Sequence, residues 1–179
     1  MNLLFSSVTD NLSYKTFLGL VNSTSNINKV LVIYKGKFEF KFERDVEIIM
    51  LKYDDLILGD YKGFEKEYTF VEEENKFVNT FNLDMLYMMN RIHRFYSFSF
   101  SDRYNALKNH VKGSIGLFNT FKPDVCLFIN MPHEVYDYGL YKIAEFRSVK
   151  KRFLMHGMQL ETYYQILENL VGNDQKLKN

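Results

Sequence analysis

The feature that most constrains this chain is a continuous apolar run, VCLFIN at 125–130, bracketed by its only two prolines, Pro123 and Pro132. An uncharged run of this length is typical of a strand that is covered on both faces of a sheet. A predicted helix over about 134–147 follows, and FLM at 153–155 then provides a second buried strand. A strand, a helix and a strand in this order form a βαβ unit with parallel strands and a right-handed crossover.

Apolar, β-branched segments nearer the N-terminus predict further strands of the same sheet. These buried strands are expected at 2–6, 29–34 and 47–53. A half-exposed strand is expected at 37–43, where apolar and charged residues alternate in KFEFKFE. The chain is therefore predicted to be an α/β protein with a mostly parallel sheet flanked by helices.

Helical spacing of apolar residues predicts the elements that cover this sheet. The predicted helices lie at 12–23, 76–96, 101–120 and 160–171. Ser101 and Asp102 supply a capping signal for the third of these helices. Gly113 and Gly116 either weaken that helix or allow it to pack closely against a neighbour. No domain boundary is evident, so residues 1–179 are expected to form one domain, with 85–171 its best-supported part.

Composition limits the classes of function. Lys and Arg number 23 against 22 Asp and Glu, and this near balance argues against an electrostatic nucleic-acid-binding protein. One weaker alternative stays open, because basic residues surround the aromatic stretch at 95–100 in a way that can bind single-stranded nucleic acid. The single cysteine, Cys126, is expected to be a buried, inert thiol. No signal peptide or apolar stretch long enough to span a membrane is found, so a cytoplasmic location is expected.

Polar side chains gather where the two C-terminal buried strands end. In open parallel α/β sheets, ligands bind in the crevice beyond the carboxyl ends of the strands. Since the two strands are parallel, both clusters of polar residues are expected to face one site. The predicted site residues at the first strand end are Asn130, His133, Glu134, Asp137 and Tyr138, and those at the second are His156, Gly157 and Gln159.

His133 is the candidate catalytic base. It follows Pro132 near the start of a predicted helix, where the partial positive charge of the helix disfavours a protonated imidazole. The same helix start has free N–H groups that can bind a phosphate. In simpler interpretations His133 only caps the helix, and Glu134 and Asp137 only complement the helix dipole. Asp137 is the weaker candidate, because it shares a helical stripe with charged residues typical of a solvated face.

The remaining candidates line the predicted crevice. His156 and Gln159 would form the wall opposite His133, and Gly157 would let a ligand approach the backbone. Arg91 or Arg94 is expected to reach into the crevice and hold an anion. Tyr138 is read either as a substrate contact or as a core residue with a satisfied hydroxyl. No two histidines show metal-ligand spacing, so no metal or cofactor is expected.

A family resemblance rests on the segment PDVCLFINMPHEVYDYGLYKIAEF at 123–146 and on KRFLMHG at 151–157. The matching features are Pro123-Asp124, the buried strand, Pro132-His133-Glu134, and Asp137-Tyr138 with Tyr141. The stretch MMNRIHRFYSFSFSDR at 88–103 adds a helix pair before that motif. Residues from about 85 to 160 thus resemble bacterial and viral capsule or surface polysaccharide biosynthesis proteins, a group similar to two-domain, GT-B-type glycosyltransferases.

The resemblance implies a Rossmann-like N-terminal domain that holds the acceptor and supplies a base, here His133, with Glu134 orienting it or binding sugar hydroxyls. In such enzymes the nucleotide-sugar donor sits mostly in a second domain, and 179 residues are about half the length of both domains together. The expected function is therefore the acceptor-side half of a glycosyltransferase for surface polysaccharide, with a carbohydrate or nucleotide-sugar as ligand.

Two alternatives come from other classes of protein. One is a non-catalytic binding module that needs a second Rossmann-like chain or another copy of itself, and it predicts an exposed apolar patch around residues 77–92. The other is a small phosphate- or nucleotide-binding protein that uses the same crevice.

Overall fold

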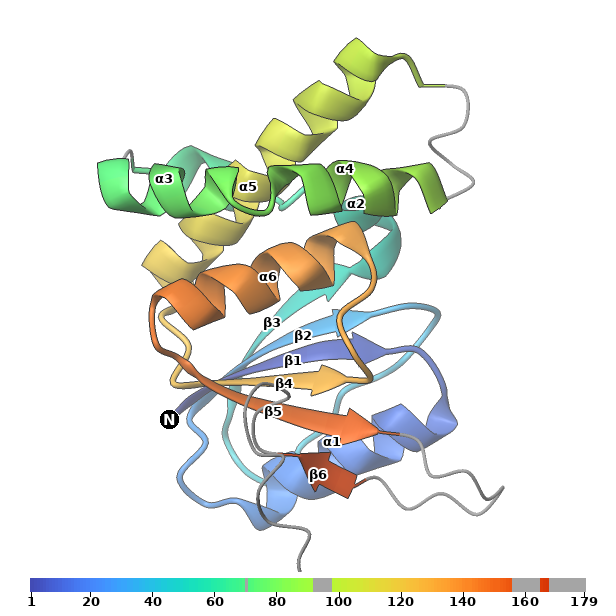
Figure 1. The fold of residues 1–179 in the computed structure, drawn as a ribbon. Helices are drawn as coiled ribbons and strands as arrows, with labels where there is room; N and C mark the ends of the chain where they lie inside the picture. The colour runs from blue at the N-terminus through green and yellow to red at the C-terminus, as the bar shows by residue number, and fades with distance from the viewer. Residues whose placement is uncertain (70, 92–97, 156–164, 168–179) are drawn as a thin grey trace, which may run out of the picture.

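A single sheet organises the chain in the computed structural model, which describes residues 1–69, 71–91, 98–155 and 165–167 (Figure 1). The strand order is β3-β2-β1-β4-β5-β6. The first five strands in this order are parallel and β6 pairs antiparallel with β5. The strands are β1 (Asn2–Val8), β2 (Lys29–Tyr34), β3 (Glu47–Lys52), β4 (Val125–Ile129), β5 (Lys150–Met155) and β6 (Gln165–Leu167). The prediction of a Rossmann-like α/β domain is confirmed.

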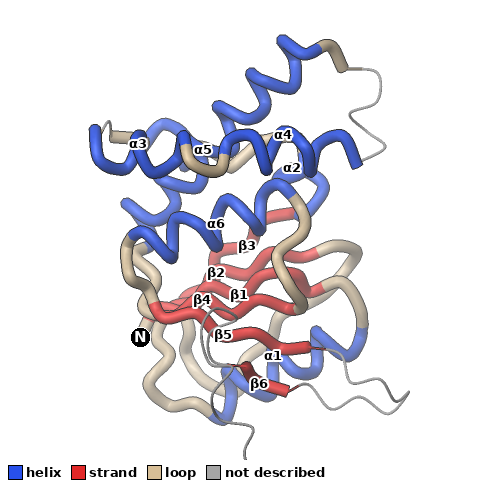
Figure 2. The backbone as a smooth tube through the Cα atoms, in the orientation of Figure 1, coloured by secondary structure: helices blue, strands red, loops and turns tan. Residues whose placement is uncertain are grey.

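Helices cover both faces of the sheet (Figure 2). Helix α1 lies on one face and α6 lies on the other, with α3 and α4 stacked beyond α6 and α5 passing behind α6 toward β4. Each face has its own apolar core because side chains alternate along a strand: Phe128 of β4 joins the α6 side and Leu127 the α1 side. The helical elements are α1 (Asn11–Ser23), α2 (Tyr53–Ile57), η1 (Phe64–Glu67), α3 (Glu72–Asn79), α4 (Asn82–Arg91), α5 (Phe100–Phe121) and α6 (Val135–Phe146).

The predicted βαβ unit is present. β4 and β5 are direct neighbours in parallel register, with Phe128 opposite Phe153, and α6 connects them. Those two rings stack with centroids 5.7 Å apart beneath α6. Cys126 lies in the same strand and is fully buried, and this burial raises the pKa of its thiol far above the usual range. The expected buried thiol is confirmed.

Two glycines bring α5 close to the segment before α3. A Cβ atom on Gly113 would lie 2.2 Å from the ring of Tyr61. A Cβ atom on Gly116 would lie 1.8 Å from the carbonyl oxygen of Phe64 in η1. Of the two readings of these glycines, close packing is the one that the structure supports.

The segment at 37–43 is a loop, so the predicted half-exposed strand is wrong. Its alternation is real, since the rings of Phe38, Phe40 and Phe42 pack on α1, where they contact Tyr14 and Phe17. Alternating apolar residues can thus cover a helix without a neighbouring strand to supply backbone hydrogen bonds.

Several predicted helix limits also differ. The predicted helix at 76–96 is two helices, α3 and α4, and its residues 92–96 lie outside the described part of the chain. Ser99, not Ser101, caps α5, because its side chain accepts the N–H of Asp102. The predicted helix at 160–171 is wrong at 165–167, which form β6. No helix among the described residues is both long enough and apolar enough to cross a membrane.

Candidate functional site

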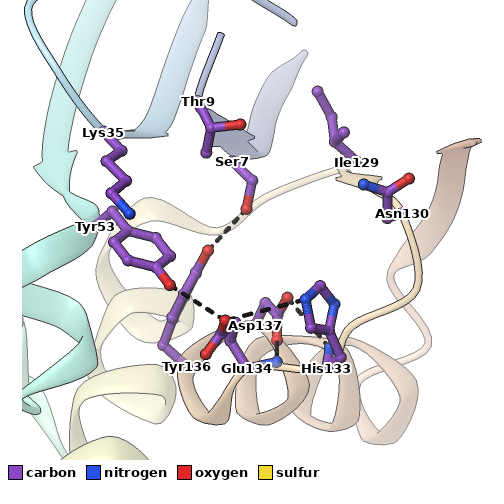
Figure 3. Close-up of a pocket in the computed structure, with 10 residues that line it drawn as sticks. All are labelled: Ser7, Thr9, Lys35, Tyr53, Ile129, Asn130, His133, Glu134, Tyr136 and Asp137. Carbon is purple, nitrogen blue, oxygen red and sulfur yellow. Dashed lines mark hydrogen bonds and ion pairs between the residues drawn. The ribbon is translucent and has the colours of Figure 1, made fainter. Parts of the chain in front are cut away.

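A cavity of about 350 Å³ opens at the carboxyl ends of the parallel strands (Figure 3). It lies where the chain reverses its direction across the sheet, since β2 and β3 extend from one side of β1 and β4 and β5 from the other. This switch point is where open α/β sheets bind ligands, and the volume is in the range of small-molecule sites. The lining residues are Ser7, Thr9, Lys35, Tyr53, Ile129, Asn130, His133, Glu134, Tyr136 and Asp137.

The loop from β4 to α6 supplies the predicted polar residues. The backbone N–H of Asn130 still donates to the carbonyl of Leu154 in β5, at 2.8 Å, although Asn130 itself has a left-handed backbone with φ of 68°. This conformation, which asparagine tolerates better than most residues, turns the chain out of the sheet. The structure thereby brings Asn130, His133, Glu134 and Asp137 to one cavity, as the sequence predicted.

Asp137 forms the floor of the cavity and caps helix α6. Its carboxylate accepts the backbone N–H of Glu134 at 2.8 Å and that of His133 at 3.4 Å. Only 4% of Asp137 is exposed, so its expected place on a solvated face is wrong. Position in the first helical turn, where N–H groups lack partners, outweighs the helical stripe that it shares with Lys142 and Glu145. Burial raises the pKa of Asp137 to about 7, although the His133 ring and both N–H groups act in the opposite direction.

Glu134 is held by a tyrosine from across the sheet. The hydroxyl of Tyr53, which follows β3, donates to Oε1 of Glu134 at 3.2 Å. Burial and the nearby Glu134 carboxylate raise the pKa of Tyr53 far above its usual range, so the hydroxyl keeps its proton and remains a donor. The ammonium of Lys35 lies over the ring of Tyr53, 4.8 Å from its centroid.

His133 presents one ring nitrogen to the cavity. Its Nδ1 lies 2.8 Å from the carbonyl oxygen of Met131, which can only accept a hydrogen bond, so Nδ1 carries a proton. In the neutral ring the free lone pair is then on Nε2, which lies 4.0 Å from Oε1 of Glu134. The side chain is 58% exposed and therefore accessible to a ligand in solution. Figure 3 shows the ring at the edge of the cavity beside Glu134 and Asp137.

Two hydroxyl groups, from Ser7 and Tyr136, form another contact in the cavity. Oγ of Ser7 and the hydroxyl of Tyr136 are 2.7 Å apart, and Tyr136 is fully buried. Ser7 has φ of 75°, and the register between β1 and β2 shifts between Phe5 and Val8. This irregularity at the end of β1 directs the Ser7 hydroxyl toward α6, as Figure 3 shows.

Both helices that begin at the switch point have carboxylates of their own at the N-terminus. Asp10 caps α1 by accepting the N–H of Ser13 at 2.7 Å, and Asp137 occupies the start of α6. The predicted free N–H groups for phosphate at the 134–147 helix are therefore already used in part, and the local charge there is unfavourable for an anion.

Of the other predicted site residues, Tyr138 lies outside the cavity. Tyr138 turns away from the cavity, because one residue along a helix rotates a side chain by about 100°. Its hydroxyl donates to Asp84 of α4 at 3.0 Å, so the predicted substrate contact is wrong for Tyr138. Arg91 ends α4, and its side chain lies outside what the structure describes, as do Arg94, His156, Gly157 and Gln159.

Six cavity residues were missed by the sequence prediction, namely the apolar Ile129 and five polar residues: Ser7, Thr9, Lys35, Tyr53 and Tyr136. A signal for four of them existed, because Ser7, Thr9, Lys35 and Tyr53 lie at or just after predicted strand ends. Their positions were therefore predictable. Their hydroxyl and ammonium groups, however, gave no reason to select them over other polar residues. Among the described residues, no group of three or more His, Cys, Asp or Glu side chains is arranged to hold a metal ion.

Comparison with known proteins adds no further assignment. No family model matches the chain, and no significant match was found among curated proteins or solved structures.

Proposed function

We propose that this chain is a carbohydrate-binding domain of the GT-B glycosyltransferase type, in which the switch-point cavity holds an acceptor sugar for surface polysaccharide synthesis. The observation that carries the proposal is the pair formed by His133 and Glu134. An imidazole nitrogen with a free lone pair and a carboxylate oxygen lie 4.0 Å apart at the mouth of one cavity. Two neighbouring hydroxyls of one sugar can each donate to one of these acceptors, so that Glu134 orients the sugar whose other hydroxyl faces His133.

The chemistry follows from these positions. His133 Nε2 would take the proton of an acceptor hydroxyl while the oxygen of that hydroxyl bonds to the anomeric carbon of a nucleotide-sugar. The bond from the anomeric carbon to the nucleotide would break, and the nucleotide would leave with its electrons. Glu134 would accept a hydrogen bond from a second sugar hydroxyl. Its carboxylate would also stabilise the positive charge that develops on the imidazole ring of His133. Tyr53, hydrogen bonded to Glu134, would act as a positioning residue. The donor is proposed as a substrate only, and no residue is assigned to it.

The charges of the cavity favour a neutral, hydroxyl-rich ligand over a phosphate. Glu134 and Asp137 contribute acceptors, Ser7 and Thr9 contribute hydroxyls, and Tyr53 contributes a ring face. Two carboxyl groups, Glu134 and Asp137, line the cavity against one ammonium, Lys35, and both helix starts near the cavity already use N–H donors on a carboxyl group of their own, which leaves fewer donors for a phosphate. The alternative of a phosphate- or nucleotide-binding protein is therefore the less favoured use of this cavity.

Binding measurements test the proposal. Calorimetry with a panel of neutral oligosaccharides is expected to find a saturable ligand. Glu134→Gln should weaken binding at least about tenfold, since a hydrogen bond to a charged group contributes about 1.5–3 kcal/mol, and His133→Ala about fivefold, for a neutral hydrogen bond of about 1 kcal/mol. Tyr138→Phe is the matched control, because its hydroxyl lies on the same helix but outside the cavity. Equal affinity in all three variants would refute the assigned site.

A second function, a binding module that needs a partner chain, is favoured by exposed apolar side chains on α4 and α5. Leu83, Tyr87 and Phe100 are each about two-thirds exposed, and Phe100 stacks on Tyr104 at the start of α5. Light scattering after size exclusion discriminates the two functions. If the chain is a monomer at all accessible concentrations and Leu83→Ser leaves its molar mass unchanged, a second copy of this chain is not the partner.

A further inference from the structure

A second cavity, of about 370 Å³, lies between α3, the start of α4 and α5. It is separate from the first, because none of its lining residues lies in the sheet or in α6. The lining residues are Tyr68, Asn75, Val78, Asn79, Asn82, Tyr104, Leu107, Lys108, Val111 and Lys112. From their chemistry we infer that this cavity is a binding site for a small anionic sugar, either a sugar phosphate or a sugar acid.

The charge of the second cavity is the opposite of that at the switch point. It is lined by two lysines, Lys108 and Lys112, and by no acidic residue. Within the described ranges, no carboxylate lies within 4.0 Å of either ammonium. The two lysines are four residues apart on one helix, where like charges repel each other. A bound anion would remove that repulsion and add two charge-assisted hydrogen bonds.

An unpartnered acceptor indicates the rest of the ligand. Oδ1 of Asn82 is buried and has no hydrogen-bond partner, while its Nδ2 donates to Oδ1 of Asn79 at 3.0 Å. A buried carbonyl oxygen without a donor is costly, and a rotation of this cavity-lining side chain toward a bound ligand would let a ligand hydroxyl satisfy it. The exposed ring of Tyr104, which lies 4.6 Å from the Lys108 ammonium, adds an aromatic surface at the rim. Ammonium groups, an amide acceptor and an aromatic ring together suit a sugar that carries a negative charge.

A ligand titration followed by the backbone amide resonances of the full chain tests this inference. The probes are glucose 6-phosphate, glucuronate, glucose and inorganic phosphate. We expect saturable shifts at residues 75–82 and 104–112 with one or both anionic sugars and none with glucose. Binding of the phosphate ester alone would identify a sugar phosphate, and binding of glucuronate alone a sugar acid. Absence of saturable shifts with both anionic sugars at millimolar concentration, or shifts only at 129–137, would overturn the inference.

Matched variants separate a site from general charge effects. Both lysine side chains are exposed, so the double variant Lys108→Gln/Lys112→Gln should still fold. It should bind the anionic sugar about tenfold more weakly, which corresponds to about 1.4 kcal/mol. Lys15→Gln/Lys150→Gln removes the same charge from two other exposed positions and should bind normally. Asn82→Ala should weaken the sugar phosphate more than inorganic phosphate. Equal losses of affinity in the two lysine double variants would contradict the site. Equal affinity for inorganic phosphate and the sugar phosphate would contradict recognition of the sugar.

Discussion

At the scale of a single residue, the burial of Asp137 makes the stability of the protein depend on pH. Its carboxyl group is almost completely buried at the floor of the switch-point cavity, and burial raises its pKa to about 7 from an ordinary value of 3.8. The folded protein therefore keeps a proton on this group at pH values where the unfolded chain has lost it. The stabilisation by this proton is complete below about pH 4 and is lost as the pH rises through about 7.

The sign of that effect gives the first prediction at this scale. Between about pH 4 and pH 7 the contribution of Asp137 to the free energy of unfolding should fall as the pH rises. Asp137→Asn should remove this slope, so the variant should gain stability relative to the original chain at higher pH. Urea unfolding of both proteins across this range measures the difference. A difference in stability that does not change with pH would contradict the assigned pKa.

His110 should behave in the opposite way. It is fully buried on α5, and burial lowers its pKa from 6.5 to about 4. The unfolded chain binds the proton more readily, so this histidine should destabilise the protein as the pH falls from about 6.5 to about 4. His110→Gln should flatten the acid limb of the stability profile, and an unchanged acid limb would show that His110 is not protonated on unfolding.

Tyr53 tests the positioning of Glu134. Tyr53→Phe removes only the hydroxyl that donates to Glu134 and keeps the ring beneath Lys35. The affinity for an oligosaccharide acceptor should fall about fivefold, about 1 kcal/mol for one lost hydrogen bond. Calorimetry measures the loss. If Tyr53→Phe weakens binding equally in a Glu134→Gln background, the two residues act independently and the positioning role is wrong.

At the scale of elements, the contact of α5 with η1 and the residues before it depends on two missing side chains. Gly113 lies against the ring of Tyr61, and Gly116 lies against the backbone of Phe64. The Tyr61 ring is fully buried and would be met near its base, so it can yield only if its neighbours shift, and the backbone carbonyl of Phe64 can yield still less. The two glycines should therefore differ in how well they tolerate a methyl group.

This contact predicts the order of stability among three glycine variants. Gly113→Ala and Gly116→Ala should lower the free energy of unfolding by about 1–3 kcal/mol, with Gly116→Ala the more severe. Gly19→Ala in α1 is the matched control, because nothing lies within 4 Å of its added Cβ, and it should stabilise the chain by up to about 1 kcal/mol. Chemical denaturation of the three variants checks the order, and a stabilising Gly116→Ala would contradict this packing.

The same scale shows where reasoning from sequence succeeded and where it failed. The apolar run of β4 and the helix after it were predictable, because local patterns specify both. The loop at 37–43 was not, since its Phe residues alternate as in a strand but pack against α1. Asp137 was assigned to a solvated face because a helical wheel ignores the special N–H groups of the first turn. The Tyr53 and Ser7 contacts join residues 81 and 129 positions apart, and no local pattern contains such pairs.

At the scale of the whole molecule, the strand order determines where chemistry is possible. Because β1 and β4 are neighbours at the reversal of the sheet, the ends of four strands contribute to one cavity. The second cavity lies in the helical layers beyond α6 and carries the opposite charge. We therefore propose a neutral sugar as the ligand at the sheet edge and an anionic sugar as the ligand among the helices.

The most direct measurement is a crystal structure of the chain soaked with a neutral oligosaccharide that binds in calorimetry. We predict one sugar hydroxyl within about 3.2 Å of His133 Nε2 and a second hydroxyl of the same sugar within that distance of a carboxylate oxygen of Glu134. A sugar bound at any other surface, with the space between these two groups filled by water alone, would contradict this prediction.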